Sequence, residues 1–335
     1  MILYLLYSKQ NAAHLAECAE LGIPENECSL IDKIVSDFKS VNILWIGLIC
    51  IIFMLSNLLR AWRWNQLLDP LGYKPKIINS LGAIMLGYFT NLAVPRIGEV
   101  VRAASLAKYE NIPAEKIFGT IVVDRILDVI SLLIVIGIAF IFSFETVGNY
   151  IAEKSNISIQ ALIYFFIIAS ILGLVGLWIL KKFIIDSEST QPFFLKIRKL
   201  ILGFKDGLLS VLKVKNLPFL IFNSIGIWLM YYLMTYLCFF AFEPTSELGP
   251  VAGLVTFVFG SLGMVIPSPG GIGTYQWLVT EALLIYNVEY SDAFSFSNIM
   301  FFTIQIFCNI AIGVFFYLFL PFYNRKSDEK NLSTE

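Results

Sequence analysis

The chain has 335 residues, of which 58% are hydrophobic and 15% are charged, and its mean hydropathy is +0.76. Soluble domains are closer to about 45–50% apolar and about 25% charged. The composition therefore excludes an ordinary soluble protein and indicates a polytopic membrane protein. The formal net charge of −1 gives no indication of a nucleic-acid partner.

Residues 1–41 are predicted to form an extracytoplasmic segment. Met1–Tyr7 is apolar but too short to span, and it lacks the basic start of a signal peptide. It is either the outer end of a truncated helix or an amphipathic stub. Cys18 and Cys28 pair as a disulfide if this segment faces an oxidising compartment, or remain two free thiols. His14 is predicted to be a solvated surface residue, because a zinc site requires several ligands.

The next part of the chain, residues 42–321, is predicted to be an all-α, polytopic transmembrane core, followed by a cytoplasmic tail at 322–335. A helix rises 1.5 Å per residue, so about 20 apolar residues cross the hydrocarbon core. Two further apolar regions, Ile77–Leu106 and Pro250–Tyr286, are interrupted by prolines. The five runs long enough to span are Asn42–Trp62, Ile117–Phe142, Ala161–Leu180, Leu217–Phe242 and Ser297–Phe319.

Lysine and arginine are distributed unevenly between the loops, which predicts orientation. They concentrate after the first run, in the loop 181–215 and in the tail 322–335, which we place in the cytoplasm of a cell with a bacterial-type cytoplasmic (inner) membrane. Acidic residues dominate the loops 145–160, 243–249 and 288–296, which we place outside.

This orientation makes the two interrupted regions hairpins of opposite direction. Ile77–Leu106 enters and leaves on the cytoplasmic side, and Pro250–Tyr286 enters and leaves on the outer side. Each is either re-entrant or a pair of full spans. The two halves of the core then form an inverted repeat with broken helices, which is typical of transporters.

The first break, Asn91–Glu99, contains Pro95 and is followed by charged residues. If the helix resumes after Pro95, then Arg96, Glu99 and Arg102 fall near one face at i, i+3 and i+6. Two cations and one anion leave a surplus positive charge beside a helix N-terminus, which predicts a site for an anion such as phosphate. The alternative is a cluster that contacts lipid phosphates non-specifically.

Three charged residues, Asp124, Arg125 and Asp128, lie within the run Ile117–Phe142. Two like charges at i, i+4 are unfavourable unless a cation lies between them. Arg125 can reach Asp128, and Arg96 or Arg102 of the hairpin can reach Asp124. The group is either an intramembrane latch or a direct substrate contact, or both.

The second break cannot form a helix because of its prolines and glycines. Its glycines allow backbone amides to approach a ligand closely, and a helix restarting near Thr274 carries Gln276 and Glu281, the latter either in the site or at the outer interface. The candidate substrate-binding residues of this break are Pro267, Pro269, Gly270, Gly271, Gly273, Gln276 and Glu281. Near the cytoplasmic end of the first run, Arg60, Arg63 and Trp64 are predicted to be interfacial anchors.

Motifs for other chemistries do not occur in the sequence. There is no Walker loop, no paired cysteine ligands, no nucleophile elbow and no acidic pair for a metal–nucleotide donor. We therefore predict no catalytic residue, no metal site and no cofactor, and we expect a transporter more than an enzyme.

Four ordered motifs give the chain a resemblance to a known family. They are formed by Arg60, Arg63 and Trp64; by Asn91, Pro95, Gly98, Glu99 and Arg102; by Asp124, Arg125 and Asp128; and by Pro269, Gly270, Gly271 and Gly273. Over about residues 42–320 the chain resembles the flippase-like transmembrane family, the membrane domain of lysylphosphatidylglycerol synthases. It departs from that pattern by a one-residue shorter spacing at Pro95, by Asp124 in place of Glu, and by Gln276 in place of Glu.

The resemblance implies lipid translocation, and it gives no support to lipid aminoacylation because the soluble transferase domain is missing. We therefore expect an anionic lipid or lipid-linked precursor as the partner, with Arg96 and Arg102 holding its phosphate. Glu99, Asp124, Arg125 and Asp128 would switch this site, and the break 267–273 would line the opposite gate. The alternatives are a membrane-embedded lipid glycosyltransferase and a non-transporting partner subunit; oligomeric state stays open.

Overall fold

The computed structural model describes residues 28–94, 97–155, 213–266 and 268–332, with isolated positions between 8 and 24. All regular secondary structure within these ranges is helical, which confirms the predicted all-α, polytopic fold. The π-helix η6 (Phe302–Cys308) joins α12 to α13 without a loop. The α-helices are α2 (Leu30–Ser40), α3 (Ile43–Leu68), α4 (Ile77–Ala93), α5 (Gly98–Glu110), α6 (Ala114–Ser155), α9 (Leu217–Ala241), α10 (Pro250–Val265), α11 (Thr274–Leu284), α12 (Tyr290–Phe301) and α13 (Asn309–Leu332).

Four helical segments are long and apolar enough to cross a membrane. They are Ile43–Leu71, Ala114–Tyr150, Leu217–Ala241 and Tyr290–Arg325, and they contain four of the five predicted runs. The fifth, Ala161–Leu180, lies outside the described residues. Helix α13 continues to Leu332, so the predicted tail begins inside a helix rather than at its end.

Local signals explain where these helices begin. Asn42 precedes α3 and its Oδ1 accepts a hydrogen bond from the Leu44 amide at 3.0 Å. Asn216 precedes α9 and its Oδ1 accepts from the Phe219 amide at 3.1 Å. Each asparagine satisfies a backbone donor that has no partner within the first turn of the helix.

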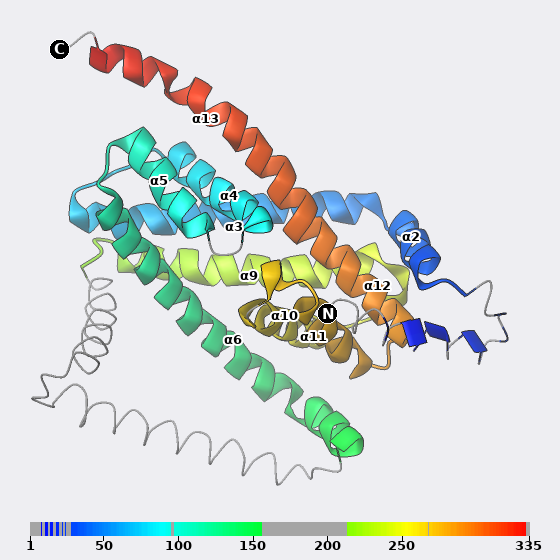
Figure 1. Cartoon of the computed structure of the whole chain (residues 1–335). Helices are drawn as coiled ribbons and strands as arrows, with labels where there is room; N and C mark the ends of the chain where they lie inside the picture. The colour runs from blue at the N-terminus through cyan, green and yellow to red at the C-terminus, as the bar shows by residue number, and fades with distance from the viewer. Residues whose placement is uncertain are drawn as a thin grey trace, which may run out of the picture.

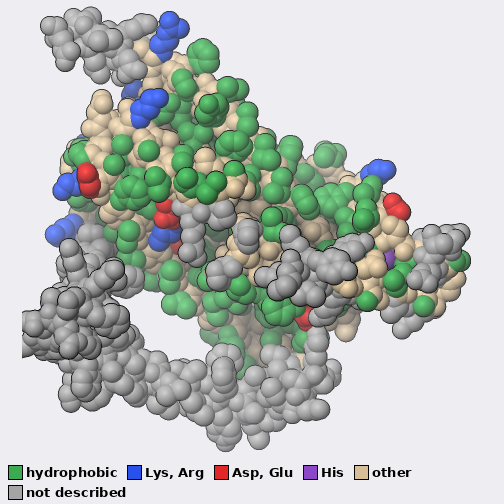
Figure 2. All heavy atoms as spheres, viewed as in Figure 1, with side chains coloured by type: hydrophobic (Ala, Val, Ile, Leu, Met, Phe, Trp, Pro, Cys, Tyr) green, Lys and Arg blue, Asp and Glu red, His purple; other side chains and the backbone are tan. Residues whose placement is uncertain are grey.

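The long helices α3 and α9 form the centre of the molecule. They pack side by side along their lengths and run in opposite directions (Figure 1). Helix α6 crosses this pair, and α4 packs on both α3 and α13. Hydrophobic side chains cover most of the described face drawn in Figure 2, as expected for helices that face lipid.

Both interrupted regions form helical hairpins, α4–α5 and α10–α11, as predicted. The apolar arms α4 and α10 have 17 and 16 residues. Helices of that length extend about 25 Å, less than the ~30 Å hydrocarbon core. Their length favours re-entrant hairpins over pairs of full spans.

The first hairpin depends on a glycine pair at the contact between its arms. A Cβ added at Gly98 on α5 would overlap the carbonyl oxygen of Gly87 on α4, and one added at Gly87 would lie 2.7 Å from the Gly98 oxygen. The two backbones therefore approach as closely as only glycine permits. In the second hairpin a Cβ at Gly263 would lie 2.8 Å from the Tyr275 Cα.

We predict that Gly98→Ala destabilises the protein by about 1–3 kcal/mol, because the added methyl group forces α4 and α5 apart. Gly119 on α6 is the matched control, since among the described residues no atom beyond its chain neighbours and its own helix backbone lies within 4 Å of a Cβ built there. Gly119→Ala should be neutral or stabilising, because alanine is the better helix former. Thermal unfolding in detergent measures both, and equal stability of the two variants would contradict the close contact.

The N-terminal segment differs from the prediction at His14. A disulfide joins Cys18 to Cys28, the first of the two predicted alternatives. The predicted solvated position of His14 is wrong: the residue is only 6% exposed, and its Nε2 lies 3.7 Å from the Cys18 sulfur. The reason is that His14 lies against both cysteines of the disulfide, since the Cys28 sulfur also lies 3.6 Å from the His14 carbonyl oxygen.

Helix α2 packs on α12 through Lys33, whose Nζ lies 2.8 Å from Asp292 and 3.3 Å from Asp37. Partial burial acts to lower the pKa of Lys33. The hydrogen bonds and charges of Asp292 and Asp37 outweigh this effect, so the pKa is raised. The ion pair holds the amphipathic helix of the N-terminal segment against the core.

Candidate functional site

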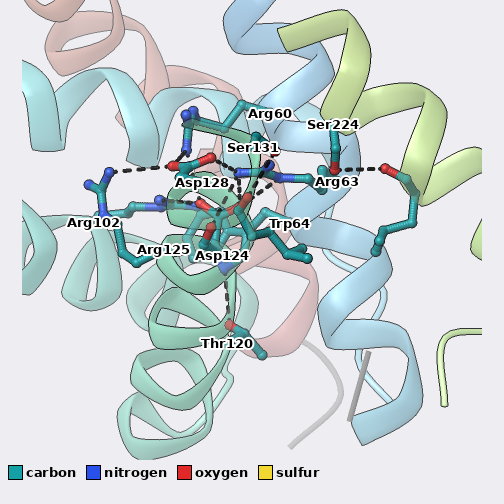
Figure 3. Close-up of polar contacts among 12 residues, drawn as sticks. Arg60, Arg63, Trp64, Arg102, Thr120, Asp124, Arg125, Asp128, Ser131 and Ser224 are labelled. Carbon is teal, nitrogen blue, oxygen red and sulfur yellow. Dashed lines mark hydrogen bonds and ion pairs between the residues drawn. The ribbon is translucent and has the colours of Figure 1, made fainter. Parts of the chain in front are cut away.

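Asp124 lies at the centre of a buried group of charges. Its side chain is fully buried, and its carboxylate oxygens lie 3.2 Å from Arg60, 2.7 Å from Arg63 and 3.2 Å from Arg102. Side chains from α3, α5 and α6 converge on it (Figure 3). A carboxylate removed from water is stable only when cations and hydrogen-bond donors surround it, as they do here.

Asp128, one turn further along α6, shares two of these cations. Arg60 Nη1 lies 2.8 Å and Arg63 Nη2 lies 2.6 Å from its carboxylate. Arg60 and Arg63 therefore each bridge both aspartates, which confirms that cations separate the like charges at i, i+4. The predicted pair Arg125–Asp128 is also present, at 3.7 Å.

Arg102 is held on two sides. Besides its contact with Asp124, its guanidinium lies 3.8 Å from the centre of the Trp64 ring. The Trp64 indole N–H donates to Thr120 Oγ1 at 3.0 Å, which fixes the ring against α6. A cation over an indole face is a favourable electrostatic contact.

The prediction of interfacial anchors at Arg60, Arg63 and Trp64 does not fit this placement. All three are at most 2% exposed, and they face α5 and α6 rather than a lipid surface. The spacing of Arg60 and Arg63 at i, i+3 places both on one face of α3, and this signal could have indicated a shared partner. Arginine and tryptophan near a helix end are equally typical of anchors.

Glu99 and Arg125 form a more exposed ion pair beside this group. Arg125 Nε donates to Glu99 Oε1 at 2.6 Å, and each side chain is 41% exposed. Glu99 does not pair with Arg102, although their spacing places both near one face of α5. Arg102 is instead bound to Asp124, and Arg96, like Pro95, lies outside the described residues.

The charged residues described above form one ionic cluster, and its charges do not balance. Four arginines against three carboxylates leave one net positive charge among the described residues of this ionic cluster. Several guanidinium nitrogens, including Arg60 Nε and Arg102 Nη2, also have no hydrogen-bond partner within the part of the chain described. The surplus predicted from Arg96, Glu99 and Arg102 stays a prediction, because Arg96 lies outside the described residues; the surplus found here comes from a different set of arginines, two of them on α3. The ionic cluster is Arg60, Arg63, Arg102, Asp124, Arg125, Asp128 and Glu99.

A cavity of about 820 Å³ opens beside the ionic cluster. Residues on both sides of the hairpin breaks line it, among them Asn91 of the first and Gly271 of the second. Arg60, Glu99, Arg125 and Asp128 line its charged part, whereas Arg63, Arg102 and Asp124 lie behind them. The two breaks thus meet at one cavity, and the role of the second break as an opposite gate stays a prediction.

The first break is closed by Asn91. Its Oδ1 accepts a hydrogen bond from the Gly98 amide at 2.7 Å, so the side chain at the end of α4 caps the start of α5. Asn91 therefore has a structural task besides lining the cavity.

The second break needs glycine for its backbone. Gly270, Gly271 and Gly273 have φ of 60°, 80° and 89°, in the region that other residues rarely adopt. Pro269 begins a short 3-10 turn there, and Pro267 lies outside the described residues. Gln276 Oε1 accepts from the Gly273 amide at 2.8 Å. Gln276 thus caps α11 and is not among the residues that line the cavity.

Glu281 lies away from the cavity. Its carboxylate accepts from the Tyr150 hydroxyl at 3.4 Å and from the Trp277 indole at 3.3 Å, and so ties α11 to the end of α6. Of the residues predicted in the second break, Gly270 and Gly271 line the cavity, while Gly273, Gln276 and Glu281 support the surrounding helices.

Comparison with known protein families gives one match. The family model of the lysylphosphatidylglycerol synthase TM region matches residues 30–313 of the chain. The chain belongs to this family. The matched part contains both hairpins, the ionic cluster and all of the residues that line the cavity.

Individual relatives of the chain are distant. The UPF0104 membrane protein MJ1078 of Methanocaldococcus jannaschii is 27% identical over 62% of this chain and 84% of its own length. The UPF0104 membrane protein PH1989 of Pyrococcus horikoshii is 24% identical over 79% of this chain and 84% of its own. Glycosyltransferase AglD of Haloferax volcanii is 23% identical over 68% of this chain, but only 41% of AglD is matched. No solved structure is significantly similar to this chain.

Proposed function

We propose that this multi-pass membrane protein moves an anionic lipid, or a lipid-linked precursor, between the leaflets of the bilayer. The observation that supports this most is the cavity in which both broken hairpins meet a charged group carrying one net positive charge. Broken helices around a central polar site are the usual construction of membrane transporters. The family relationship is compatible with this role and is not specific for it.

Phosphate is the anion that fits the charged part of the cavity. Arg60 and Arg125 both line it, and a guanidinium can donate two parallel hydrogen bonds to phosphate oxygens. The net positive charge of the ionic cluster favours an anion at this place over a neutral or zwitterionic group. Asp124 holds Arg60 from behind, and Asp128, which itself lines the cavity, contacts both Arg60 and Arg125.

A lipid fits better than a small soluble anion because the cavity is bordered by apolar side chains that are open to the outside. Val129 of α6 and Val265 of α10 line the cavity and are 55% and 66% exposed. Acyl chains can therefore remain against these helices while the head group occupies the charged part. This arrangement spares the apolar tails from contact with polar groups.

Reconstitution of the purified chain in vesicles tests this proposal. Fluorescent phosphatidylglycerol should reach the opposite leaflet faster than in empty vesicles, and zwitterionic phosphatidylcholine should not. Sugar transfer from a nucleotide or polyprenyl donor, with no leaflet exchange in its absence, would support the glycosyltransferase alternative. Absence of both activities would favour a partner subunit instead.

The orientation of the chain is part of the proposal. We infer that it lies in a cytoplasmic membrane with the loop before α4 and the C-terminus in the cytoplasm, because positive residues concentrate there. Lys74 and Glu247 are exposed positions predicted on opposite sides.

Lys74→Cys should accordingly react only with a membrane-permeant thiol reagent in intact cells, and Glu247→Cys should also react with an impermeant one. Labelling of the unmodified chain supplies the baseline for its native cysteines. The reverse pattern would overturn the orientation and with it the direction assigned to both hairpins.

A further inference from the structure

The cavity has a second, uncharged part that the ionic cluster does not explain. Trp228 and Tyr231 of α9 line it, as do Gln305 within the π-helix η6 and Asn309 directly after it. A π-helical turn inserts one residue into the helical repeat and is frequent at functional sites. Here it lies at the point where two amide side chains meet the cavity.

Asn309 presents an unused acceptor. The residue is 5% exposed, and its Nδ2 donates to the Gln305 carbonyl oxygen at 3.0 Å. Its Oδ1 has no hydrogen-bond partner among the described residues. A buried amide oxygen without a partner is costly, so a ligand that donates a hydrogen bond to it would be favoured.

Trp228 presents an unused donor in the same cavity. Its indole Nε1 is buried and has no partner within the described part of the chain. The ring is fixed by edge contacts with Tyr231 and Phe257, whose centroids lie 6.1 and 5.9 Å away. A rigid indole with a free N–H can both cover an apolar ligand face and donate one hydrogen bond.

Tyr231 connects this uncharged part to the charged one. Arg60 Nη2 donates to the Tyr231 hydroxyl at 3.1 Å, and the Tyr231 ring contacts Trp228. The donor on Trp228 therefore lies only one side chain away from an arginine of the ionic cluster. A group bound beside Trp228 would therefore lie next to a phosphate held by Arg60.

We propose that Trp228, Gln305 and Asn309 form a subsite for the uncharged, hydroxyl-bearing part of a phosphate head group, such as a sugar or glycerol. A hydroxyl both donates and accepts, which matches an amide oxygen on one residue and an indole N–H on another. The neutral side chains offer no charge with which to recognise an ammonium group. This inference rests on the proposed function and names its substrate class.

Binding of matched lipid pairs to the purified full chain tests the subsite. Phosphatidylglycerol is compared with phosphatidylpropanol, and a polyprenyl phosphohexose with polyprenyl cyclohexyl phosphate. Members of a pair carry the same charge and differ in hydroxyl groups, and comparison of the pairs separates glycerol from sugar. Wild type should bind the hydroxylated member of at least one pair about three- to tenfold more tightly, as expected for one added hydrogen bond.

Asn309→Leu and Trp228→Phe should each lower the ratio of the two affinities toward one. Asn57→Leu is the matched control: Asn57 also donates to the carbonyl four residues earlier, and its buried Oδ1 has no partner in the described ranges, but it does not line the cavity. It should leave the preference unchanged. Native mass spectrometry of lipid displacement measures all three.

Equal binding of both members of both pairs by wild type would overturn the subsite. So would an equal loss for both members in the Asn309 and Trp228 variants, or an effect of Asn57→Leu as large as theirs. The proposed function fails separately, if no anionic lipid binds more tightly than phosphatidylcholine.

Discussion

Replacing Asp124 with asparagine should destabilise the protein by about 3–5 kcal/mol, the cost of leaving a buried charge without its partner. Arg60, Arg63 and Arg102 all contact this carboxylate, and each is at most 4% exposed. Asparagine keeps the size of the side chain but raises the net charge of the ionic cluster from one to two. Chemical or thermal unfolding in detergent measures the loss.

A second substitution should recover a large part of that stability. Arg102→Met in the Asp124→Asn background returns the cluster to one net positive charge and keeps an apolar contact with Trp64. Asp69→Asn is the control for a surface pair, because the Lys215 side chain that Asp69 contacts is 73% exposed. This substitution should lower the free energy of unfolding by at most about 1 kcal/mol. If Asp124→Asn and Asp69→Asn are equally mild, the cluster is not buried as described.

Substitutions of Arg125 and Glu99 should change the binding of an anionic lipid in opposite directions. Arg125→Gln should weaken binding about ten- to a hundredfold, since it removes a charged hydrogen-bond donor to the phosphate. Arg125→Lys keeps the charge but loses the planar guanidinium. Its affinity for the lipid should therefore lie between those of Arg125→Gln and wild type. Transbilayer movement in vesicles should decline in the same order.

Glu99→Gln should instead tighten binding, because Glu99 occupies the guanidinium that the phosphate requires. The pair is 2.6 Å apart but 41% exposed on each side, so solvent weakens it and the expected gain is only about two- to fivefold. Lys33→Gln removes a cation from the pair with Asp292, away from the cavity, and should leave binding unchanged. A loss of binding in Glu99→Gln as large as in Arg125→Gln would show that the pair is only structural.

The sequence by itself determined the class of the molecule and its breaks. Hydrophobicity and helix length are local properties, so the spans in α3, α6, α9 and α13 follow from composition alone. Proline and glycine act on the backbone of their own turn. The breaks between the two arms of each hairpin were therefore predictable as well. The need for a cation between Asp124 and Asp128 followed from helical spacing, which is also local.

Only the tertiary structure decided which residues meet. Arg60 and Arg63 could face lipid or protein, and the packing of α3 against α6 turned them inward onto Asp124 and Asp128. The same packing placed Arg102 behind the cavity and Arg125 beside it. Such pairings depend on how helices distant in sequence are rotated and how closely their backbones approach. The joining of both breaks in one cavity has the same origin, because neither hairpin encloses that space alone.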